Sequence, residues 1–449
     1  MLHNCINYFF MFMKKGNMAI RMAAVLTLVS AAAVASARSK ADVQIDSLVK
    51  SHQIVFFGDG DKPSADSVSS LIYNFYYDQF RHFQDPLAPY FLFMSKDADL
   101  AMGIGGCVRM RGWFDWGGSV GIPGFAPYAI PMNASPDKDK WLGITPSGTA
   151  LFYRVIGRNK RFGEYQLYIE ANFNGYQSRD FHLKKAYAII NDWTIGYANS
   201  TFCDVTALPP TVDAQGPNVK MSATSVLVRW MHSFKKGWTV AASVETPSDA
   251  IDYDGVNTEN CDQYIPDFAA FGQWEWERGQ HIRLAGIVRS LPYMDLLTST
   301  KHNDVGWGLQ LSTIVRPTES LTLYGCVNGG KGYAGLGGDW QLGRYDLIGN
   351  PDAPGRMYAP GAWGGYGAVQ YNFKPNLFAS VTVSGARYCP GHSVSPQEYK
   401  SGLYGAVNAF WNLTSRIQVG AEFNIGRRQN FDGAHRWARR VGAMAQFSF

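Results

Sequence analysis

The sequence predicts an all-β fold: a transmembrane antiparallel β-barrel of about 16 strands, with a short N-terminal periplasmic helical segment in front of it. Apolar and polar residues alternate through most of the chain, which is the pattern of strands with one apolar face. An export signal precedes this pattern. No apolar run in the mature chain reaches the roughly 20 residues of a membrane-spanning helix. With 14% aromatic and only 17% charged residues, the chain is also too aromatic to be a disordered one.

Residues 1–37 have the features of a secretory signal peptide. Lys14 and Lys15 form a positive region, residues 22–34 are apolar, and the Ala-Ser-Ala sequence at 35–37 is a small-residue cleavage site. The apolar run is too short for a membrane anchor. We expect translation to start at Met13 and the mature chain to begin after residue 37.

Residues 38–98 are predicted to form a periplasmic extension that contains an amphipathic helix. Apolar residues recur at helical spacing between residues 64 and 83, and Pro86 ends the pattern. Two roles stay open for this helix: packing under the barrel, or contact with a neighbouring subunit.

Residues 99–449 are predicted to form the barrel itself. In the clearest strand, residues 100–114, Met102 and Val108 face one way while Arg109 faces the other. The strand candidates have roughly 9 to 12 residues, which is the length of a tilted membrane strand.

The last strand, residues 441–449, shows the same alternation and ends in an aromatic residue. Its apolar face includes Val441 and Phe449, and Met444 interrupts its polar face. We expect this strand to pair with residues 100–114 and so to close the barrel.

The connections between the predicted strands alternate between short and long. Short links are expected near residues 159, 191, 235, 278, 317, 375 and 415. Longer ones are expected at 117–147, 200–222, 247–267, 291–304, 329–361 and 389–401. Tight turns at one end and long loops at the other are typical of barrels in the outer membrane of Gram-negative bacteria, with the turns in the periplasm. A soluble β-sandwich or propeller would carry more charge on its apolar faces and no aromatic residues at both edges of an apolar band.

No catalytic residue, cofactor or metal site is predicted. Five of the six cysteines lie in the mature chain, an odd number without a CxxC pair, and the histidines are scattered without spaced partners. Two alternatives to a channel stay open. One is a barrel enzyme that hydrolyses lipid or peptide at the outer rim, and the other is a structural or adhesive barrel whose loops bind partners.

Basic residues fall on the predicted lumen face. If Met102 and Val108 contact lipid, Arg109 and Arg111 point inward, because a charge facing lipid at mid-depth costs about 2–4 kcal/mol. The same argument gives a set of predicted pore-lining basic residues: Arg109, Arg111, Lys184, Arg283, Arg289, Arg428 and Arg440. These outnumber the inward carboxylates. The sequence therefore predicts a water-filled channel for small, preferably anionic solutes.

Residues 200–220 are the predicted constriction loop of this channel. Pro209 and Pro210 stiffen the loop, and folding it inward would hold Asp204 and Asp213 opposite the arginines. The alternative is an ordinary external loop.

Four stretches carry a resemblance to a known family: residues 100–111, 183–187, 200–218 and 265–267. The most specific is the Pro-Thr-Val-Asp to Gly-Pro-Asn segment at 210–218. With these stretches, the chain resembles the DcaP-like trimeric porins of Gram-negative outer membranes. The resemblance implies a sixteen-stranded homotrimeric barrel that passes small anionic solutes such as dicarboxylates. The resemblance also implies that the barrel is surrounded by outer-membrane lipid and that the protein does not bind nucleic acid. The aromatic content and the extension before the barrel look like a Bacteroidetes version.

Overall fold

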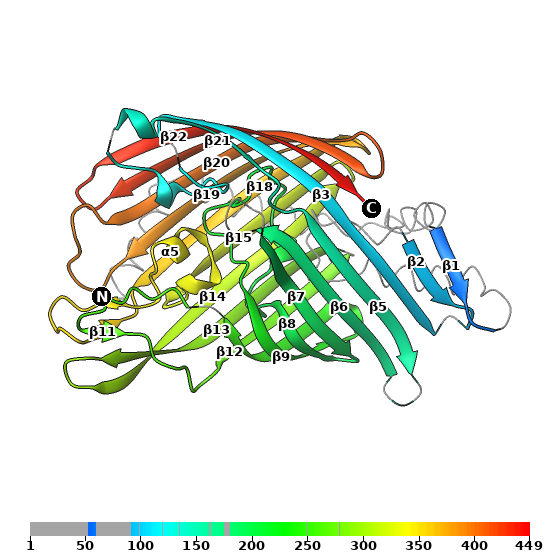
Figure 1. Ribbon diagram of the computed structural model, residues 1–449, viewed down its shortest axis with the longest axis horizontal. Coiled ribbons are helices and arrows are strands. Elements are labelled where there is room, and N and C mark those ends of the chain that lie inside the picture. The colour runs from blue at the N-terminus through cyan, green and yellow to red at the C-terminus, as the bar shows by residue number, and fades with distance from the viewer. Residues whose placement is uncertain are drawn as a thin grey trace.

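The computed structural model describes residues 53–59, 91–97, 99–118, 120–133, 135–159, 161, 163–174, 180–247, 249–277 and 279–449 (Figure 1). The predicted signal peptide, the start at Met13 and the helix at 64–83 lie outside these residues. Among the helices that are described, none has the length and apolar character needed to cross a membrane.

Sixteen of the described strands form one closed antiparallel barrel. They are β3 (Leu100–Trp116), β5 (Ala150–Asn159), β6 (Gly163–Asn174), β7 (Asp180–Ile190), β8 (Trp193–Asn199), β9 (Thr224–Ser233), β10 (Trp238–Pro247), β12 (Asp267–Glu277), β13 (Gln280–Asp295), β14 (Thr300–Thr318), β15 (Leu321–Lys331), β18 (Gly361–Lys374), β19 (Leu377–Cys389), β20 (Tyr399–Asn412), β21 (Ile417–Asn430) and β22 (His435–Ser448). Each strand pairs with the next, and β22 pairs with β3 to close the wall (Figure 1). The predicted fold class is confirmed.

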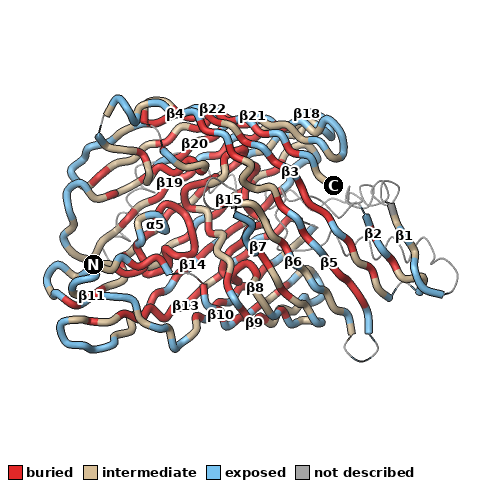
Figure 2. The backbone as a smooth tube through the Cα atoms, in the orientation of Figure 1, coloured by how far each residue is buried: buried red, intermediate tan, exposed pale blue. Residues whose placement is uncertain are grey.

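The barrel strands alternate between exposed apolar and buried polar residues, and Figure 2 shows the alternating burial along strands such as β3. On β3, Val108 and Met110 are 53% and 45% exposed, whereas Arg109 and Arg111 are each 9% exposed. The exposed set faces outward, where lipid replaces water, and the buried set faces the lumen. Closure leaves no unpaired strand edge in the lipid, where a free edge would be costly.

Short turns join the strands at one end of the barrel, and all the long loops lie at the other end, where the β13–β14 and β21–β22 connections are also short. Four of these connections matter below: loop A (residues 117–149), loop B (200–223), loop C (249–266) and loop D (332–360). They contain short elements: 3₁₀ helices at Pro127–Ala129, Pro136–Lys138, Val205–Ala207 and Ala334–Leu336; the strands β4 (Lys140–Thr145), β11 (Thr258–Glu259), β16 (Ile348–Gly349) and β17 (Met357–Tyr358); and the helix α5 (Gly338–Leu342). A further 3₁₀ helix, Lys235–Gly237, forms the turn between β9 and β10.

The prediction of a long loop at residues 291–304 is wrong. There β13 continues to Asp295 and β14 begins at Thr300, so only a four-residue turn separates them. The extra strand length is stabilised by apolar packing, because Leu291 and Tyr293 are buried in a cluster with Leu347 and Met357 of loop D.

Two short strands precede the barrel in the part of residues 38–98 that is described. β1 (Gln53–Phe57) pairs parallel with β2 (Phe91–Ser95), and β2 pairs antiparallel with the start of β3, with Phe91 opposite Ile104. Figure 1 shows both strands projecting beyond the turn end of the barrel. Their alternation is too short to stand out in the sequence.

Much of the apolar core lies inside the barrel, under loops that fold inward. Phe202 of loop B and Trp340 of loop D are fully buried in one cluster, and Phe125 of loop A is fully buried in another. Met444, the apolar residue on the lumen face of β22, packs against Val212 of loop B. The inward loops therefore decide which part of the wall borders the remaining lumen.

Candidate functional site

Loop B leaves β8, contacts Glu245 of β10 through Ser200 and Thr201, and is then anchored on the inner faces of β13 and β14. The anchor is the buried carboxylate of Asp204, which begins a 3₁₀ helix by accepting from the backbone N–H of Thr206. His281 Nε2 lies 2.7 Å from Asp204 Oδ2, and Ser312 Oγ donates to the same oxygen at 2.6 Å. Asp204 thus holds loop B against the barrel wall and does not face an open lumen.

A second anchor holds the tip of loop B against β19, β20 and β21. Pro209 and Pro210 are buried, and the Pro210 carbonyl accepts from Asn408 Nδ2 at 2.7 Å. The backbone N–H groups of Val212 and Asp213 each donate to the carboxylate of Glu422 at 2.9 Å. The loop therefore lies inside the barrel, along its wall.

Loop B returns by pairing with loop D. Asn218 Nδ2 donates to Asp339 Oδ2 at 2.9 Å, and Met221 forms an isolated β-bridge with Gly337. Gly337 has φ +139°, and a Cβ there would lie 2.4 Å from the Lys220 carbonyl oxygen, so this contact requires glycine. With these anchors and its contacts with Glu245 of β10 and Met444 of β22, loop B lies along the inner wall from β10 to β22, and the barrel strands outside this range are β3 and β5–β9.

Arg109 and Arg111 of β3 lie side by side on the wall next to loop B, since Arg111 pairs across the strands with Met444 of β22. Arg109 Nε donates to Gln446 Oε1 at 2.6 Å, and Arg111 Nη1 donates to the Ser147 carbonyl at 3.0 Å. A Cβ added at Gly148 would lie 2.9 Å from Arg109 Nη1 and 3.1 Å from Arg111 Nη1, so both guanidinium groups pack over this glycine. Among the described residues, the buried Nε of Arg111 has no hydrogen-bond partner. Two cations therefore meet here with one donor still unused.

Lys184 and Lys185 of β7 form a second basic pair, and both contact Glu170. Their Nζ atoms lie 2.6 Å and 3.8 Å from the Glu170 carboxylate, and the Lys184 side chain remains 35% exposed. Strict alternation sends only Lys184 inward. The pairing of β6 with β7 shifts register here, from Glu170 opposite Lys185 to Ala171 opposite Leu183. This bulge turns both lysines inward, which is why sequence reasoning missed Lys185.

Lys220 of loop B is the third basic element, and sequence reasoning missed it because alternation says nothing about a loop. Burial lowers the pKa of Lys220 to about 8; Asp213 acts in the opposite direction, and the charges of Arg111 and Lys184 lower it further. These influences place Lys220 among the basic groups of β3 and β7. Basic side chains thus approach one region from two walls and from the loop.

Three of the predicted pore-lining arginines do not line a passage, which corrects the prediction. Arg283, Arg289 and Arg440 do point inward, but the loops cover them and they are only 1%, 1% and 2% exposed. Arg283 Nη1 lies 3.6 Å from Asp204, and Arg440 makes two hydrogen bonds, of 2.6 Å and 2.9 Å, with Asp115. Alternation along a strand predicts whether a side chain points inward or outward. It does not predict whether a loop from elsewhere in the chain covers that side chain.

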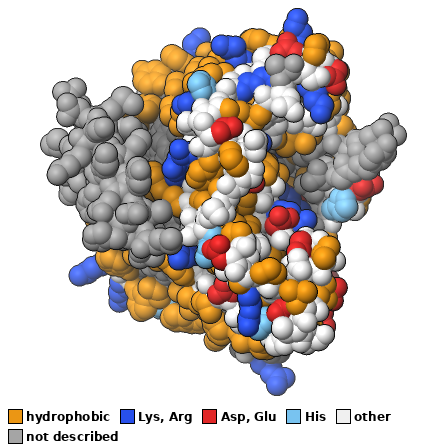
Figure 3. All heavy atoms as spheres, turned by 90° about the vertical axis from the view of Figure 1, so that its left-hand side faces the viewer, with side chains coloured by type: hydrophobic (Ala, Val, Ile, Leu, Met, Phe, Trp, Pro, Cys, Tyr) orange, Lys and Arg blue, Asp and Glu red, His pale blue; other side chains and the backbone are white. Residues whose placement is uncertain are grey.

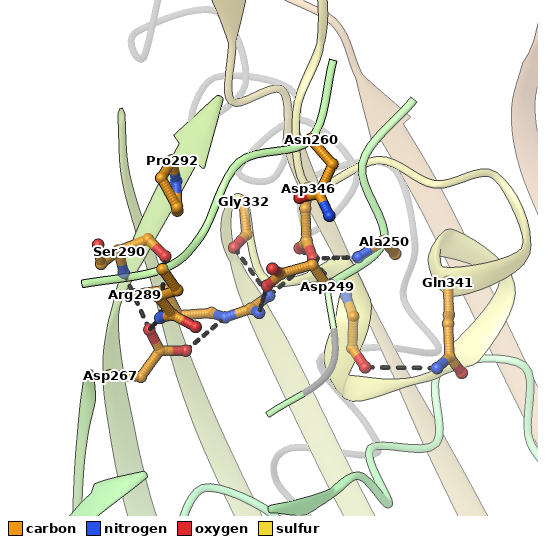
Figure 4. A network of polar contacts seen from close by, with 12 residues as sticks. Asp249, Ala250, Asn260, Asp267, Arg289, Ser290, Pro292, Gly332, Gln341 and Asp346 are labelled. Atoms are coloured by element: carbon orange, nitrogen blue, oxygen red, sulfur yellow. Dashed lines mark hydrogen bonds and ion pairs between the residues drawn. The ribbon is translucent and has the colours of Figure 1, made fainter. Parts of the chain in front are cut away.

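Arg289 is the extreme case, with three carboxylates around one guanidinium (Figure 4). It lies 2.8 Å from Asp249 of loop C, 2.9 Å from Asp267 of β12 and 2.8 Å from Asp346 of loop D. These acids more than offset its charge. Arg289 therefore holds loops C and D to the wall and adds no positive field.

Arg428, the remaining predicted basic residue, holds loop A. Its Nη1 donates to the Tyr128 carbonyl at 2.6 Å and its Nε donates to Asn430 at 3.0 Å. Its guanidinium also lies 5.2 Å and 5.9 Å from the ring centres of Tyr128 and Tyr399.

One Ser, one His and one Asp do meet in the lumen, but not as a catalytic triad. Ser312 and His281 both contact Asp204, so the histidine does not stand between the hydroxyl and the carboxylate. All three side chains are buried beneath loop B. This arrangement anchors a loop and offers no activated nucleophile. Among the described residues, no group of three or more His, Cys, Asp or Glu is placed to hold a metal ion.

No protein-family model and no curated protein matches the chain. Among solved structures, the outer membrane channel DcaP of Acinetobacter baumannii is similar over 80% of this chain and 99% of its own, with a TM-score of 0.67 and 17% identity. The anion-selective porin of Comamonas acidovorans is similar over 78% of this chain and 100% of its own, with a TM-score of 0.51 and 9% identity. A loop-deletion mutant of OmpT, an outer membrane protein of Vibrio cholerae, also has a TM-score of 0.51, with 11% identity over 78% of this chain and 100% of its own.

These likenesses show that the chain has the fold of outer-membrane porins. Together with the closed barrel and its apolar outer surface, they support the predicted location in the outer membrane of a Gram-negative bacterium. Membership of the DcaP-like family and a Bacteroidetes source stay predictions.

Proposed function

We propose that the protein is an outer-membrane channel whose passage favours small anions, with dicarboxylates as the first solutes to test and a homotrimer as its assembly. The main support for this proposal is that five basic residues lie close to one region beside loop B: Arg109, Arg111, Lys184, Lys185 and Lys220. Three of the four predicted basic residues on the covered side of the barrel, Arg283, Arg289 and Arg440, are offset by carboxylates. The net positive field is thus concentrated on the side that loop B leaves uncovered.

The chemistry of this region favours anions for two reasons. Basic groups in a narrow, partly desolvated passage lower the energy of a negative solute and raise that of a positive one. Glu170 offsets one of the two lysines of β7, and no described carboxylate forms an ion pair with Arg111. Positive charge therefore remains available to a passing anion.

We expect purified protein in planar bilayers to form channels whose reversal potential under a KCl gradient shows preference for Cl⁻. Preference for K⁺ would refute the anion proposal but not the channel. Absence of conductance would favour the alternative of a structural or adhesive barrel. The loops that fold into the lumen are the observation that supports this alternative. Absence of conductance together with turnover of lipid or peptide would instead favour the enzyme.

The preference should also depend on pH through Lys220. With its pKa at about 8, Lys220 is about nine-tenths protonated at pH 7 and about one-tenth protonated at pH 9, so its charge disappears across this interval. We expect the Cl⁻/K⁺ permeability ratio of the wild type to fall about two- to threefold between pH 7 and pH 9. The Lys220→Arg variant, which keeps its charge, should hold its ratio. An equal fall in both proteins would exclude Lys220 as the titrating group.

A further inference from the structure

We propose that loops A, B and D are held together more tightly in acid than at neutral pH, through a junction at Asp339 that acts as a pH switch for the loop end of the lumen. The loops meet at the end of the barrel that Figure 3 views, where acidic and basic side chains lie side by side on the surface. Asp339 lies in α5 of loop D, below that surface, and is 0% exposed. A switch of this kind acts on the loops, whichever ions pass through the lumen.

Three hydrogen bonds from three different segments end on the Asp339 carboxylate. Tyr399 Oη, at the start of β20, donates to Oδ2 at 2.7 Å, and Asn218 Nδ2 of loop B donates to the same oxygen at 2.9 Å. The backbone N–H of Tyr128 in loop A donates to Oδ1 at 3.3 Å. The Asp339 N–H in turn donates to the Asn218 carbonyl at 2.8 Å. One carboxylate therefore joins loops A, B and D to the barrel wall.

The junction packs closely against Gly402 of β20. A Cβ added at Gly402 would lie 2.5 Å from Tyr399 Oη, 2.6 Å from Asp339 Oδ2 and 2.9 Å from Asn218 Nδ2. Three polar atoms from β20, loop D and loop B thus meet over this glycine, and any side chain there would push them apart. Ser384 Oγ of β19 donates to Asn218 Oδ1 at 2.5 Å, which keeps the amide turned with its Nδ2 toward Asp339.

The Asp339 carboxylate is buried without a direct counter-ion. Two other buried carboxylates, both in loop B, have a cation close by: Asp204 lies 3.6 Å from Arg283, and Asp213 lies 3.6 Å from Arg440. Among the residues that the structure describes, no Lys, Arg or His side chain forms an ion pair with Asp339. Burial without a counter-ion disfavours the charged form of a carboxylate.

The titratable and charged groups that face Asp339 come from three elements. They are Tyr399 of β20, Tyr128 of loop A and Arg428 of β21, and Arg428 donates to the Tyr128 carbonyl and faces both tyrosine rings. At this contact, loop B presents the neutral Asn218. Burial raises the pKa of Asp339 to about 6, although the three hydrogen bonds and the charge of Arg428 act in the opposite direction.

Acid favours the closed junction, because the neutral form of Asp339 avoids the cost of a buried charge. When the loops are released, water surrounds the carboxylate and its pKa returns to the ordinary value of 3.8. A state that binds a proton more tightly is stabilised as the pH falls. In the closed junction, Asp339 is about one-eleventh ionised at pH 5 and about ten-elevenths ionised at pH 7, whereas released Asp339 is almost fully ionised at both. The ratio of released to closed loops should therefore rise about ninefold from pH 5 to pH 7.

Limited proteolysis of the purified protein in detergent measures this ratio, because the cutting rate follows the population of released loops when closing is faster than cutting. Papain is used at pH 5 and pH 7 on the wild type and on Asp339→Asn, which carries no charge at either pH. Cuts are followed at residues 120–133 of loop A and 214–222 of loop B. We expect the wild-type rate, divided by the Asp339→Asn rate at the same pH, to rise about ninefold from pH 5 to pH 7. This division removes the pH dependence of papain itself. A quotient that stays constant or falls would overturn the proposal.

The matched control is Asp249→Asn. Burial also raises the pKa of Asp249 to about 6, but this residue of loop C contacts Arg289 and not the junction. The Asp249→Asn variant should keep the ninefold rise at the loop A and loop B sites. If the rise disappears in this variant, Asp249 is the titrating group and the proposal fails.

Two further variants keep the test decisive if Asp339→Asn does not fold. Gly402→Ala should be cut rapidly at both pH values, because its Cβ displaces the three polar atoms, and it then serves as the reference. Tyr399→Phe removes a hydrogen bond to the ionised form of Asp339, so the rise in cutting should move to higher pH. Slow cutting of Gly402→Ala, or a rise at the same pH in Tyr399→Phe as in the wild type, would show that this junction does not control the loops.

Discussion

Replacing Arg109 and Arg111 together by glutamine is expected to lower the Cl⁻/K⁺ permeability ratio by about tenfold and to leave the barrel folded. The two guanidinium groups lie against Gly148 and supply two of the charges of the proposed passage. Two unit charges about 6 Å from a passing ion in a water-filled passage contribute about 0.7 kcal/mol each, which together is a factor of about ten. Reversal potentials in a KCl gradient measure the ratio directly.

The matched control for this variant is Arg387→Gln, which removes the same kind of side chain from the outer face of the same barrel. It should leave the permeability ratio unchanged. If both variants change the ratio equally, net charge and not position would be responsible. If neither changes it, the passage does not run beside Arg109 and Arg111.

Replacing Glu422 by alanine is expected to release the tip of loop B and to raise the single-channel conductance. The buried carboxylate accepts from the backbone N–H groups of Val212 and Asp213 and from the side chains of Asn408 and Asn424, at 2.8–2.9 Å. Its loss leaves these donors unpaired, at a cost of about 1–3 kcal/mol each when they stay buried. Moving the loop tip into water relieves that cost, so the loop should leave the wall.

The control for this experiment is Ser380→Ala, which removes the contacts of Ser380 Oγ with the Pro210 carbonyl, at 3.3 Å, and with Asn408 Oδ1, at 2.7 Å, but keeps the Glu422 carboxylate. Its conductance should match that of the wild type. Limited proteolysis gives a second measurement, since a released loop should be cut between residues 208 and 218 in Glu422→Ala only. Unchanged conductance and protection in Glu422→Ala would mean that loop B is held without Glu422.

The barrel was predictable because lipid and lumen impose opposite demands on neighbouring residues. A charged side chain such as Arg109, next to an apolar residue such as Val108 that faces lipid, must point into the lumen. The same alternation recurs along the barrel strands. Only local information is needed for that inference. Strand ends were less predictable where apolar residues pack on a loop, as Leu291 does beyond the expected end of β13.

The electrostatics of the lumen were not predictable to the same extent. The three acids around Arg289 come from positions 249, 267 and 346, and no local pattern connects them. A bulge reoriented Lys185, and a folded loop positioned Lys220. Each of these depends on where separate segments meet in space, which alternation along one strand does not encode.

The strand β2 has a consequence for how the barrel reaches its correct size. One edge of a strand holds one partner at a time, and β2 occupies the edge of β3 from Ala101 to Ile104, just below the point where the backbone of Phe449 pairs with Gly106. The β2–β3 contact is local in the chain, whereas β22 comes from more than 300 residues away, so we expect β2 to pair first. When β22 arrives, it cannot slide past Gly106. We therefore expect β2 to act as a stop that fixes the stagger of the last pairing, and with it the tilt and diameter of the barrel.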